Sequence, residues 1–343
     1  MLYPLSYWGL VTGAHAEDPR RPSHHVRTGP GRTKQPDRVA AQVAPALRHR
    51  RAAPPHIRGV NPTTRSGALV LASGRARPRR TTTNGCTETE DITVDLGLRG
   101  SAALVTGGNR GIGLATARAL VAEGARVALL GRDTEALAVA RETLGPETVT
   151  VVADTTDDAQ VRRAVDAAAG QLGRLDVVVN AAAPRATGAQ PTGLAGLDEA
   201  DFLRQVDTKA LGYLRVVRAA LPHLLAAGGG SVVNISGMNA RSTGAIAGSV
   251  RNIAVVALSK NLADELGPHG ISVVCVHPGL TVTERNADDP EYAAKAAGLN
   301  ALGRAISAEE VADVVAFLAS PRGRVANGSV VTVDGGRPGA IWA

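Results

Sequence analysis

The sequence has few of the residues that mark secreted, metal-binding or membrane-spanning proteins. Cysteine occurs only at Cys86 and Cys275, which is too few for a disulfide framework or a metal-binding cluster. No apolar run reaches the roughly 18 residues that a membrane-spanning helix needs. These scarcities argue against a disulfide-stapled secreted domain and a membrane protein, and they favour a protein of the reducing cytoplasm without a metal site.

Aromatic residues are also scarce and make up only 2% of the chain. A hydrophobic core must therefore be packed with Val, Leu, Ile and Ala, as the cores of parallel α/β sheets often are. With 343 residues the chain can hold one large or two ordinary domains and bury a sizeable core.

Charge and proline are distributed unevenly along the chain. Residues 1–93 carry 15 Lys and Arg against 6 Asp and Glu, together with 10 of the 19 prolines. Residues 94–343 carry 23 Lys and Arg against 25 Asp and Glu, so the net charge of +7 comes from the first part. That part has no regular hydrophobic period and too little apolar surface to offset the entropy of ordering. We predict a disordered basic leader over 1–93 and one folded domain over 94–343.

Several interpretations of the leader stay open. The weakly apolar stretch from Leu2 to Val11 is followed by Ala14-His15-Ala16, which resembles a signal-peptide cleavage site, but it lacks a basic start and contains Pro4 and Gly9. An Arg-rich leader is also typical of a transit peptide or a nucleic-acid-binding arm. We favour a start site assigned too far upstream, with a cytoplasmic protein that begins near Val94 and has no nucleic-acid partner.

The stretch from Ala102 to Gly113 reads A-A-L-V-T-G-G-N-R-G-I-G. Its apolar start predicts a buried strand, which breaks into glycines before a helical pattern. Gly107 permits a sharp turn, Gly111 lets the backbone approach a pyrophosphate, and Gly113 permits close packing of the helix. The N–H groups at the start of that helix would face phosphates. The alternative is a glycine-rich turn without a ligand.

Beyond this stretch, short apolar runs alternate with helical patterns, which is typical of a doubly wound parallel sheet. We predict an α/β fold in a single domain, with a Rossmann-type parallel sheet. Between the sixth strand and the last helix, a polar and acidic segment from Thr283 to Asn300 has the character of a mobile lid. The predicted strands are 102–105, 127–130, 148–152, 175–179, 231–235, 271–276 and 330–333, and the predicted helices are 114–123, 157–170, 202–226, 248–266 and 308–320.

The residues after the second strand discriminate between the two nicotinamide cofactors. An acidic residue there holds the ribose 2′-hydroxyl of NAD, whereas a basic residue accommodates the 2′-phosphate of NADP. Here Gly131 occupies the position of the acidic residue, and Arg132 follows it. Arg110 in the glycine turn could bind the same 2′-phosphate. The pattern predicts NADP(H) rather than NAD(H), and ordinary surface charge is the alternative. Asp154, after the third strand, is expected to meet the adenine edge.

Five motifs in order resemble the short-chain dehydrogenase/reductase family. They are T-G-G-N-R-G-I-G (106–113), L-G-R-L-D-V-V-V-N-A-A-A (172–183), H-P-G-L-T-V-T (277–283), G-R-x-x-x-x-E-E-V-A from Gly303, and a terminal V-D-G-G. The resemblance implies an NAD(P)-binding Rossmann domain, a substrate-covering segment after Pro278-Gly279, and a homodimer or homotetramer built through the two long helices. The expected cofactor-binding residues are Gly107, Asn109, Arg110, Gly111, Ile112, Gly113, Arg132, Asp154, Asn180, Pro278, Gly279 and, near the nicotinamide amide, Thr283.

The chain departs from that family at the catalytic residues. The family works through a Ser, a Tyr and a Lys in a Y-x-x-x-K pattern, with an Asn from the preceding long helix. Alignment puts Gly248 at the Tyr position, Asn252 at the Lys position, Gly237 at the Ser position and Lys209 at the Asn position. The loss matters because a general acid typically contributes about 10²- to 10⁴-fold to the rate.

Few other residues offer a replacement for the missing acid. Tyr213 and Tyr292 are the only tyrosines of 94–343. Each is either recruited to the active site or is an ordinary packing or surface residue. His277, at a strand end, is expected to be structural.

Two function hypotheses follow from the folded domain, and a third, a nucleic-acid-binding protein that works through the basic leader, requires that the leader be part of the protein. The first is an NADP(H)-binding oxidoreductase that transfers a hydride to or from a small carbonyl or alcohol through a rebuilt site. In that site Asn252 would bind the ribose hydroxyls, and Lys209, with a pKa lowered by burial, would donate a proton or bind an anionic group. The second is a non-catalytic NADP(H)-binding sensor or scaffold whose catalytic positions have drifted. The sequence identifies no substrate.

Overall fold

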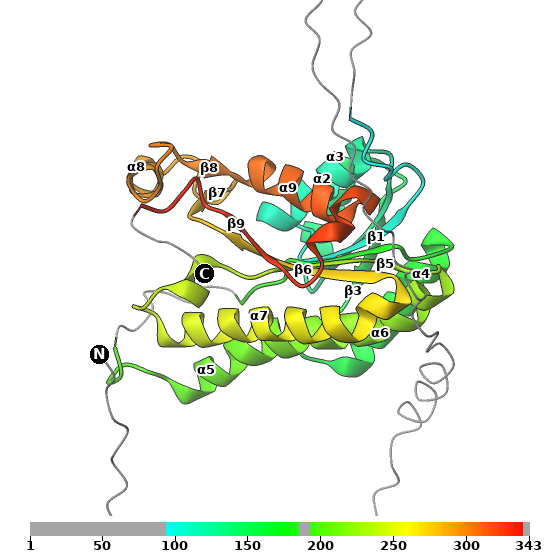
Figure 1. Ribbon diagram of the computed structural model, residues 1–343, viewed down its shortest axis with the longest axis horizontal. Helices are drawn as coiled ribbons and strands as arrows, with labels where there is room; N and C mark the ends of the chain where they lie inside the picture. Colours follow the sequence, from blue (N-terminus) through cyan, green and yellow to red (C-terminus); the bar gives the residue numbers. More distant parts are fainter. Residues whose placement is uncertain (1–93, 185–192, 339–343) are drawn as a thin grey trace, which may run out of the picture. The chain divides into compact units, whose positions relative to one another are not determined.

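The computed structural model describes residues 94–184 and 193–338, and the predictions for the leader lie outside these residues. Seven parallel strands form one sheet in the order β3-β2-β1-β4-β5-β6-β9 (Figure 1). The strand order reverses between β1 and β4, which is the position where ligands bind in such sheets, at the carboxyl ends of the strands. The doubly wound fold is thus confirmed. The strands are β1 Ala102–Thr106, β2 Arg126–Gly131, β3 Val149–Val152, β4 Val177–Asn180, β5 Gly230–Ile235, β6 Ile271–Pro278 and β9 Val330–Val333.

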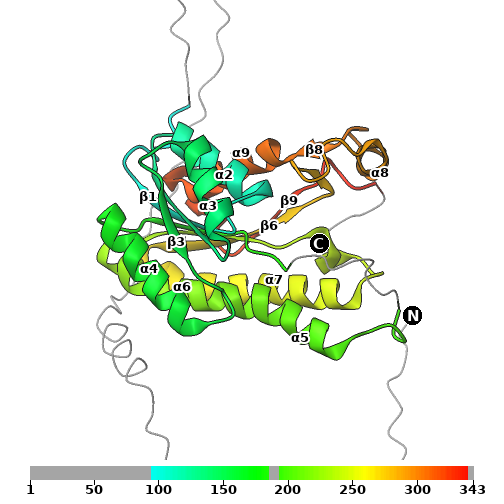
Figure 2. The same ribbon diagram turned by 180° about the vertical axis from the view of Figure 1, so that it is seen from behind.

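Helices cover both faces of the sheet, as Figures 1 and 2 show from opposite sides. One face carries α2 Gly111–Ala122, α3 Thr134–Leu144 and α9 Ala308–Ala319. The other face carries α4 Asp158–Leu172, α6 Gly212–Ala226 and α7 Ile246–Leu266, with α5 Glu199–Val206 leading into α6.

Each face of the sheet has its own hydrophobic core. Along β1, Ala102 and Leu104 pack with residues of α4 and α6, whereas Ala103 and Val105 pack with residues of α2 and α9. Successive side chains of a strand point to opposite faces, so a strand covered on both sides is apolar at most positions. This explains why the strands read as continuous apolar runs.

The long helix predicted over 202–226 is divided into three parts. A π-helical segment, Asp207–Leu211, separates α5 from α6 and carries Lys209. Such segments insert one residue into the helical ladder and occur frequently at functional sites. The hydrophobic period does not reveal this insertion because the helix continues on both sides of it.

The segment predicted as a lid has defined structure. It contains α8 Pro290–Gly298, and the preceding residues form a short strand, β7 Thr281–Val282, that pairs with β8 Ile306–Ser307. The helix α3 was not among the predicted helices. None of the helices in the described ranges combines the length and apolarity that crossing a membrane requires.

Candidate active site

The glycine turn after β1 adopts backbone geometry that only glycine meets without strain. Gly107 and Gly111 have φ of +66° and +54°, and a Cβ on Gly107 would lie 2.9 Å from the backbone of Ala182. A Cβ on Gly113 would lie 2.3 Å from the Gly107 oxygen, so this glycine lets α2 pack against the turn itself. Gly108, which the sequence did not single out, is less restricted, because its ideal Cβ would lie 2.7 Å from the end of the Leu129 side chain and 3.1 Å from the Val105 oxygen.

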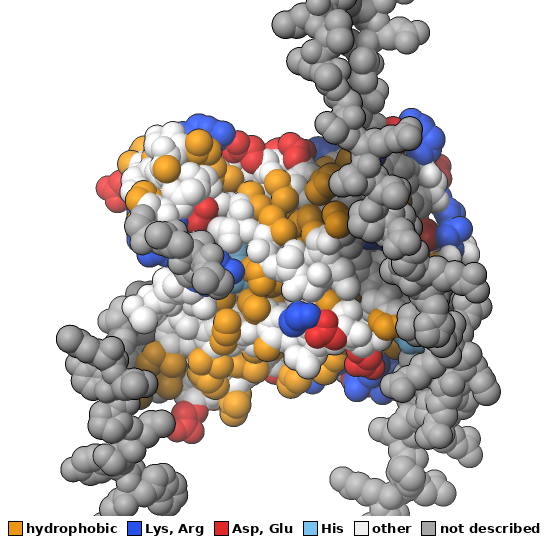
Figure 3. All heavy atoms as spheres, in the orientation of Figure 1, with side chains coloured by type: hydrophobic (Ala, Val, Ile, Leu, Met, Phe, Trp, Pro, Cys, Tyr) orange, Lys and Arg blue, Asp and Glu red, His pale blue; other side chains and the backbone are white. Residues whose placement is uncertain are grey.

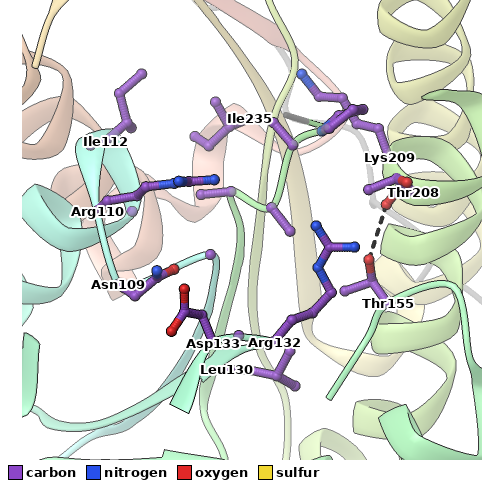
Figure 4. Close-up of a pocket in the computed structure, with 18 of the residues that line it drawn as sticks. Asn109, Arg110, Ile112, Leu130, Arg132, Asp133, Thr155, Thr208, Lys209 and Ile235 are labelled. Atoms are coloured by element: carbon purple, nitrogen blue, oxygen red, sulfur yellow. Dashed lines mark hydrogen bonds between the residues drawn. The ribbon is translucent and has the colours of Figure 1, made fainter. Parts of the chain in front are cut away.

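A first cavity of about 310 Å³ opens at the carboxyl ends of β1, β2, β4 and β5, where the strand order reverses (Figure 4). Its walls come from the glycine turn, the end of β2, the residues after β4 and the start of the lid. Most of the expected cofactor residues line it, namely Gly107, Asn109, Arg110, Gly111, Ile112, Gly113, Arg132, Pro278 and Thr283.

An acidic side chain already lies at the start of α2. Both carboxylate oxygens of Glu284 accept hydrogen bonds from the Gly111 N–H, at 2.9 and 3.1 Å. The N-terminus of a helix favours anions because its N–H groups and its dipole point at them. The carboxylate therefore acts as a stand-in for a phosphate, and the turn fits the pyrophosphate of a dinucleotide. No sequence signal identified Glu284, which lies 173 residues from Gly111.

The side chains of Arg110 and Arg132 extend into the first cavity from the glycine turn and from the end of β2 (Figure 4). Arg132 Nη1 also donates a hydrogen bond to Asp154 Oδ2 at 3.0 Å. Burial acts to raise the pKa of Asp154, but hydrogen bonds from Thr156 and Arg132 outweigh it and hold the pKa below its usual value. Asp154 therefore stays ionised and neutralises part of the charge of Arg132.

Three expected cofactor residues do not line the first cavity, namely Asp154, Asn180 and Gly279. The carboxylate of Asp154 is turned to Arg132 and Thr156, and its neighbours Ala153 and Thr155 line the cavity instead. Asn180 is fully buried, and its amide donates to Asn234 Oδ1 at 2.9 Å. The geometry of Asp154 and Asn180 suits positioning of the adjacent backbone, and their direct contact with a cofactor stays a prediction.

A second cavity of about 430 Å³ adjoins the first, and its lining includes Gly237, Asn252 and Gly279. Gly279 was expected at the cofactor and belongs to this second cavity instead. Three residues line both cavities, namely Lys209, Ser236 and Pro278. These three mark the junction between the two spaces.

Lys209 is buried at this junction. Its Nζ donates hydrogen bonds to the Ser236 backbone oxygen at 2.8 Å and to Asn252 Oδ1 at 2.9 Å. Burial lowers the pKa of Lys209 to about 7, and the charge of Arg251 adds to that effect. An ammonium has three N–H donors, so one remains for a ligand.

Asn252 is held at the second cavity. Its side chain accepts from Lys209, and its backbone oxygen accepts a hydrogen bond from Ser236 Oγ at 2.8 Å. The fold thus brings Lys209 and Asn252, which are 43 residues apart, into direct contact. Asn252 does not line the first cavity, so its contact with a ribose stays a prediction.

Asparagine side chains approach the space above the two glycines at the aligned Ser and Tyr positions. A Cβ on Gly237 would lie 3.0 Å from Asn252 Nδ2, and a Cβ on Gly248 would lie 2.8 Å from Asn239 Nδ2. A larger residue at either position would have to displace an amide.

The remaining candidate groups do not reach either cavity. Tyr213 is fully buried, its hydroxyl lies 3.0 Å from the Ala182 and Ile235 oxygens, and burial raises its pKa. Tyr292 donates to the Thr281 oxygen at 3.2 Å. His277 is fully buried, which lowers its pKa to about 4 and keeps it neutral at pH 7. Lys209 is thus the titratable group at the junction.

Comparison with known proteins gives relatives over the same part of the chain. A family model described as enoyl-(acyl carrier protein) reductase matches residues 107–337. The short-chain reductase protein NovJ of Streptomyces niveus is 34% identical over 250 residues, covering 69% of this chain and 94% of that protein. A 3-alpha-(or 20-beta)-hydroxysteroid dehydrogenase of Mycobacterium tuberculosis is 38% identical over 248 residues, covering 70% of this chain and 90% of that protein.

Solved structures show the same architecture. The L-sorbose reductase of Gluconobacter frateurii, determined with NADPH and L-sorbose, superposes with a TM-score of 0.65 at 26% identity. The match covers 72% of this chain and 100% of that chain. The family model and these relatives agree with the motifs and with the seven-stranded parallel sheet, so the chain belongs to the short-chain dehydrogenase/reductase family.

Proposed function

We propose that the protein is an NADP(H)-dependent oxidoreductase that acts on a small carbonyl or alcohol and uses Lys209 as its proton donor and acceptor. One observation carries the proposal. Lys209 Nζ lies at the junction of the two cavities, held by the Ser236 oxygen and by Asn252 Oδ1. A cofactor in the first cavity and a substrate in the second would meet beside this group.

The first cavity supports NADP(H) as the cofactor. The glycine turn and the anion-binding start of α2 suit a pyrophosphate, and Arg110 and Arg132 suit a 2′-phosphate. Gly131 ends β2 at the position of the acidic residue, and Arg132 follows it. The next carboxylate, Asp133, lines the cavity but accepts a hydrogen bond from the Ala136 N–H as the N-cap of α3. The NADPH-bound sorbose reductase is consistent with this choice.

The chemistry of the proposed site is simple. When bound, NADPH supplies a hydride for a carbonyl carbon, and the carbonyl oxygen then needs one proton. Lys209 Nζ gives that proton and is left as a neutral amine, which a pKa of about 7 permits near neutral pH. Ser236 and Asn252 orient the amine through their oxygens, and in the oxidative direction the neutral amine accepts the proton.

The alternative is a non-catalytic NADP(H)-binding sensor or scaffold. The glycines at the aligned Tyr and Ser positions favour it, because the ordinary proton donor of the family is missing. Both hypotheses predict cofactor binding, and only the first predicts turnover that depends on Lys209.

We further propose a homo-oligomer built through the long helices. Leu203 on α5 and Ile246, Val250 and Ile253 on α7 are exposed, with 38% to 65% of each residue accessible. Figure 3 shows apolar side chains gathered over this part of the molecule. Apolar groups spread along two adjacent helices are typical of an interaction surface. We also propose a cytoplasmic location, which the cysteine content favours.

The test is titration of the full-length protein with NADPH and with NADH, followed by a panel of small aldehydes and ketones. We expect tighter binding of NADPH and slow reduction of at least one carbonyl. NADPH binding without turnover on any member of the panel would favour the sensor. A failure to bind either cofactor would overturn both hypotheses.

A further inference from the structure

The second cavity differs in charge from the domain that contains it. Residues 94–343 carry 23 basic against 25 acidic residues. Among the described residues, however, the cavity lining contains four basic side chains, Lys209, Arg251, Lys295 and Arg337, against one acidic side chain, Asp334. The fold therefore concentrates positive charge at this place, which ordinary surface composition does not account for.

These basic residues come from separate elements that meet only in the folded chain. Lys209 lies in the π-helical segment, Arg251 on α7, Lys295 on α8, and Arg337 follows β9. Because they are spread over more than a hundred residues, no single basic run of the sequence explains the cluster.

The charges in the lining are incompletely paired. Arg251 donates to Gln205 through one amino group, while its Nε is buried and has no hydrogen-bond partner in the described part of the chain. Within the same ranges, Lys295 and Arg337 form no ion pair with an Asp or Glu. Asp334 accepts a hydrogen bond from the Gly336 N–H at 2.9 Å through Oδ1, whereas its Oδ2 is buried without a partner in the described part of the chain. One carboxylate therefore faces four basic side chains in the described lining, which leaves the cavity an excess of donors and positive charge.

We propose that the second cavity binds the anionic group, carboxylate or phosphate, of a small carbonyl substrate. This inference rests on the proposed function for the identity of the reacting group, but the anion site itself does not require turnover. Arg251 would hydrogen-bond the anion inside the cavity, and Lys295 and Arg337 would attract it at the rim. The carbonyl end of the substrate would then lie toward Lys209, at the junction with the first cavity.

The test compares matched pairs of substrates with and without the anion. Acetoacetate is compared with methyl acetoacetate, and dihydroxyacetone phosphate with dihydroxyacetone, all with NADPH. We expect kcat/KM for one anion to exceed that of its neutral partner by about 10- to 100-fold, the range of one charge-assisted hydrogen bond. The advantage should shrink with added salt, because the rim charges are exposed and screened. The pair in which the anionic substrate has the higher kcat/KM shows whether the cavity binds a carboxylate or a phosphate.

Variants test whether the preference for the anionic substrate depends on the second cavity. Lys295→Met with Arg337→Met should lower the anion-to-neutral ratio of kcat/KM by about threefold to tenfold, as expected for exposed charges. Lys260→Met is the matched control, because Lys260 lies on α7 outside the cavity and pairs with Asp264. It should leave the ratio unchanged. Equal kcat/KM values within both pairs, or a preference that the double variant retains, would overturn the anion site.

A binding measurement separates this inference from the proposed function. The NADPH complex is titrated by calorimetry with acetoacetate and with inorganic phosphate. Binding that the double variant weakens, without turnover of any carbonyl, would refute the redox function and support the anion site. Reduction of neutral carbonyls without binding of either anion would support the redox function and overturn the anion site.

Discussion

Replacement of Lys209 by Met tests the proposed proton donor most directly. Methionine retains most of the apolar stem and removes the charge and the donors. Loss of a general acid typically lowers the rate about 10²- to 10⁴-fold, which corresponds to roughly 3–5.5 kcal/mol in the activation barrier. We expect kcat for carbonyl reduction to fall within that range. NADPH affinity should change much less, because the glycine turn and the arginines hold the cofactor in our proposal.

The pH dependence of the rate gives an independent readout. Reduction needs the ammonium form of Lys209, whose pKa is about 7, so kcat/KM of the wild-type protein should fall as the pH rises above 7. Oxidation of the alcohol should show the opposite trend, because it needs the neutral amine. The Lys209→Met variant should lose the inflection near pH 7. The assay follows NADPH absorbance across buffers of constant ionic strength.

Stability should respond to the same group. The folded pKa of about 7 lies below the ordinary 10.5, so between these values the unfolded chain binds the extra proton. Stability of the wild-type protein therefore rises with pH in this window, by up to about 1.4 kcal/mol per pH unit from this group. Below pH 7 Lys209 is charged in both states, so the free-energy cost of burying its charge lowers the stability of the folded protein in full. Denaturant unfolding of Lys209→Met should lack this rise.

Lys260→Met is the matched control for these measurements, since it removes an exposed lysine outside both cavities. It should leave the rate, the pH profile and the unfolding curve unchanged. Full turnover by Lys209→Met with the wild-type pH profile would refute the assignment of Lys209 as proton donor.

Three further predictions concern the cofactor site and the N-terminal leader. Arg132→Ala should weaken NADPH binding by about tenfold, the lower range of a charge-assisted hydrogen bond, and affect NADH less; equal losses for both cofactors would contradict the 2′-phosphate contact. Glu284→Gln should tighten NADPH binding by about two- to fivefold, because it removes an anion that competes for the Gly111 N–H; weaker binding would indicate that Glu284 assists the cofactor. Removal of residues 1–93 should leave the melting temperature and NADPH affinity within error, and a drop of several degrees would show that the leader contributes to the domain.

Much of the fold was predictable because it is encoded by local spacing. The apolar run 102–105 and the glycines after it predict a strand, a turn and a helix in immediate succession, and the structure has β1, the turn and α2 there. Continuous apolar strands with few polar positions indicate a sheet that is covered on both faces. Alignment of the motifs also brought Lys209 and Asn252 into one site, and the structure joins them by a hydrogen bond.

Other features depend on residues that meet only after folding. The Glu284 carboxylate reaches Gly111 across 173 residues, and Asp154 turns to Arg132 rather than into the first cavity. Neither contact leaves a trace in hydrophobic periodicity, because both involve polar side chains on loops whose positions depend on the packing of the whole sheet.

The candidate catalytic residues show the same division between what adjacent residues determine and what the folded chain determines. The sequence by itself determined that the aligned catalytic positions hold Gly237, Gly248, Asn252 and Lys209. Only the tertiary structure decided that Lys209 is buried between two cavities, with a pKa lowered to about 7. The physical reason is that burial and charge proximity are sums over neighbours from distant segments, whereas strand and helix periods are properties of adjacent residues.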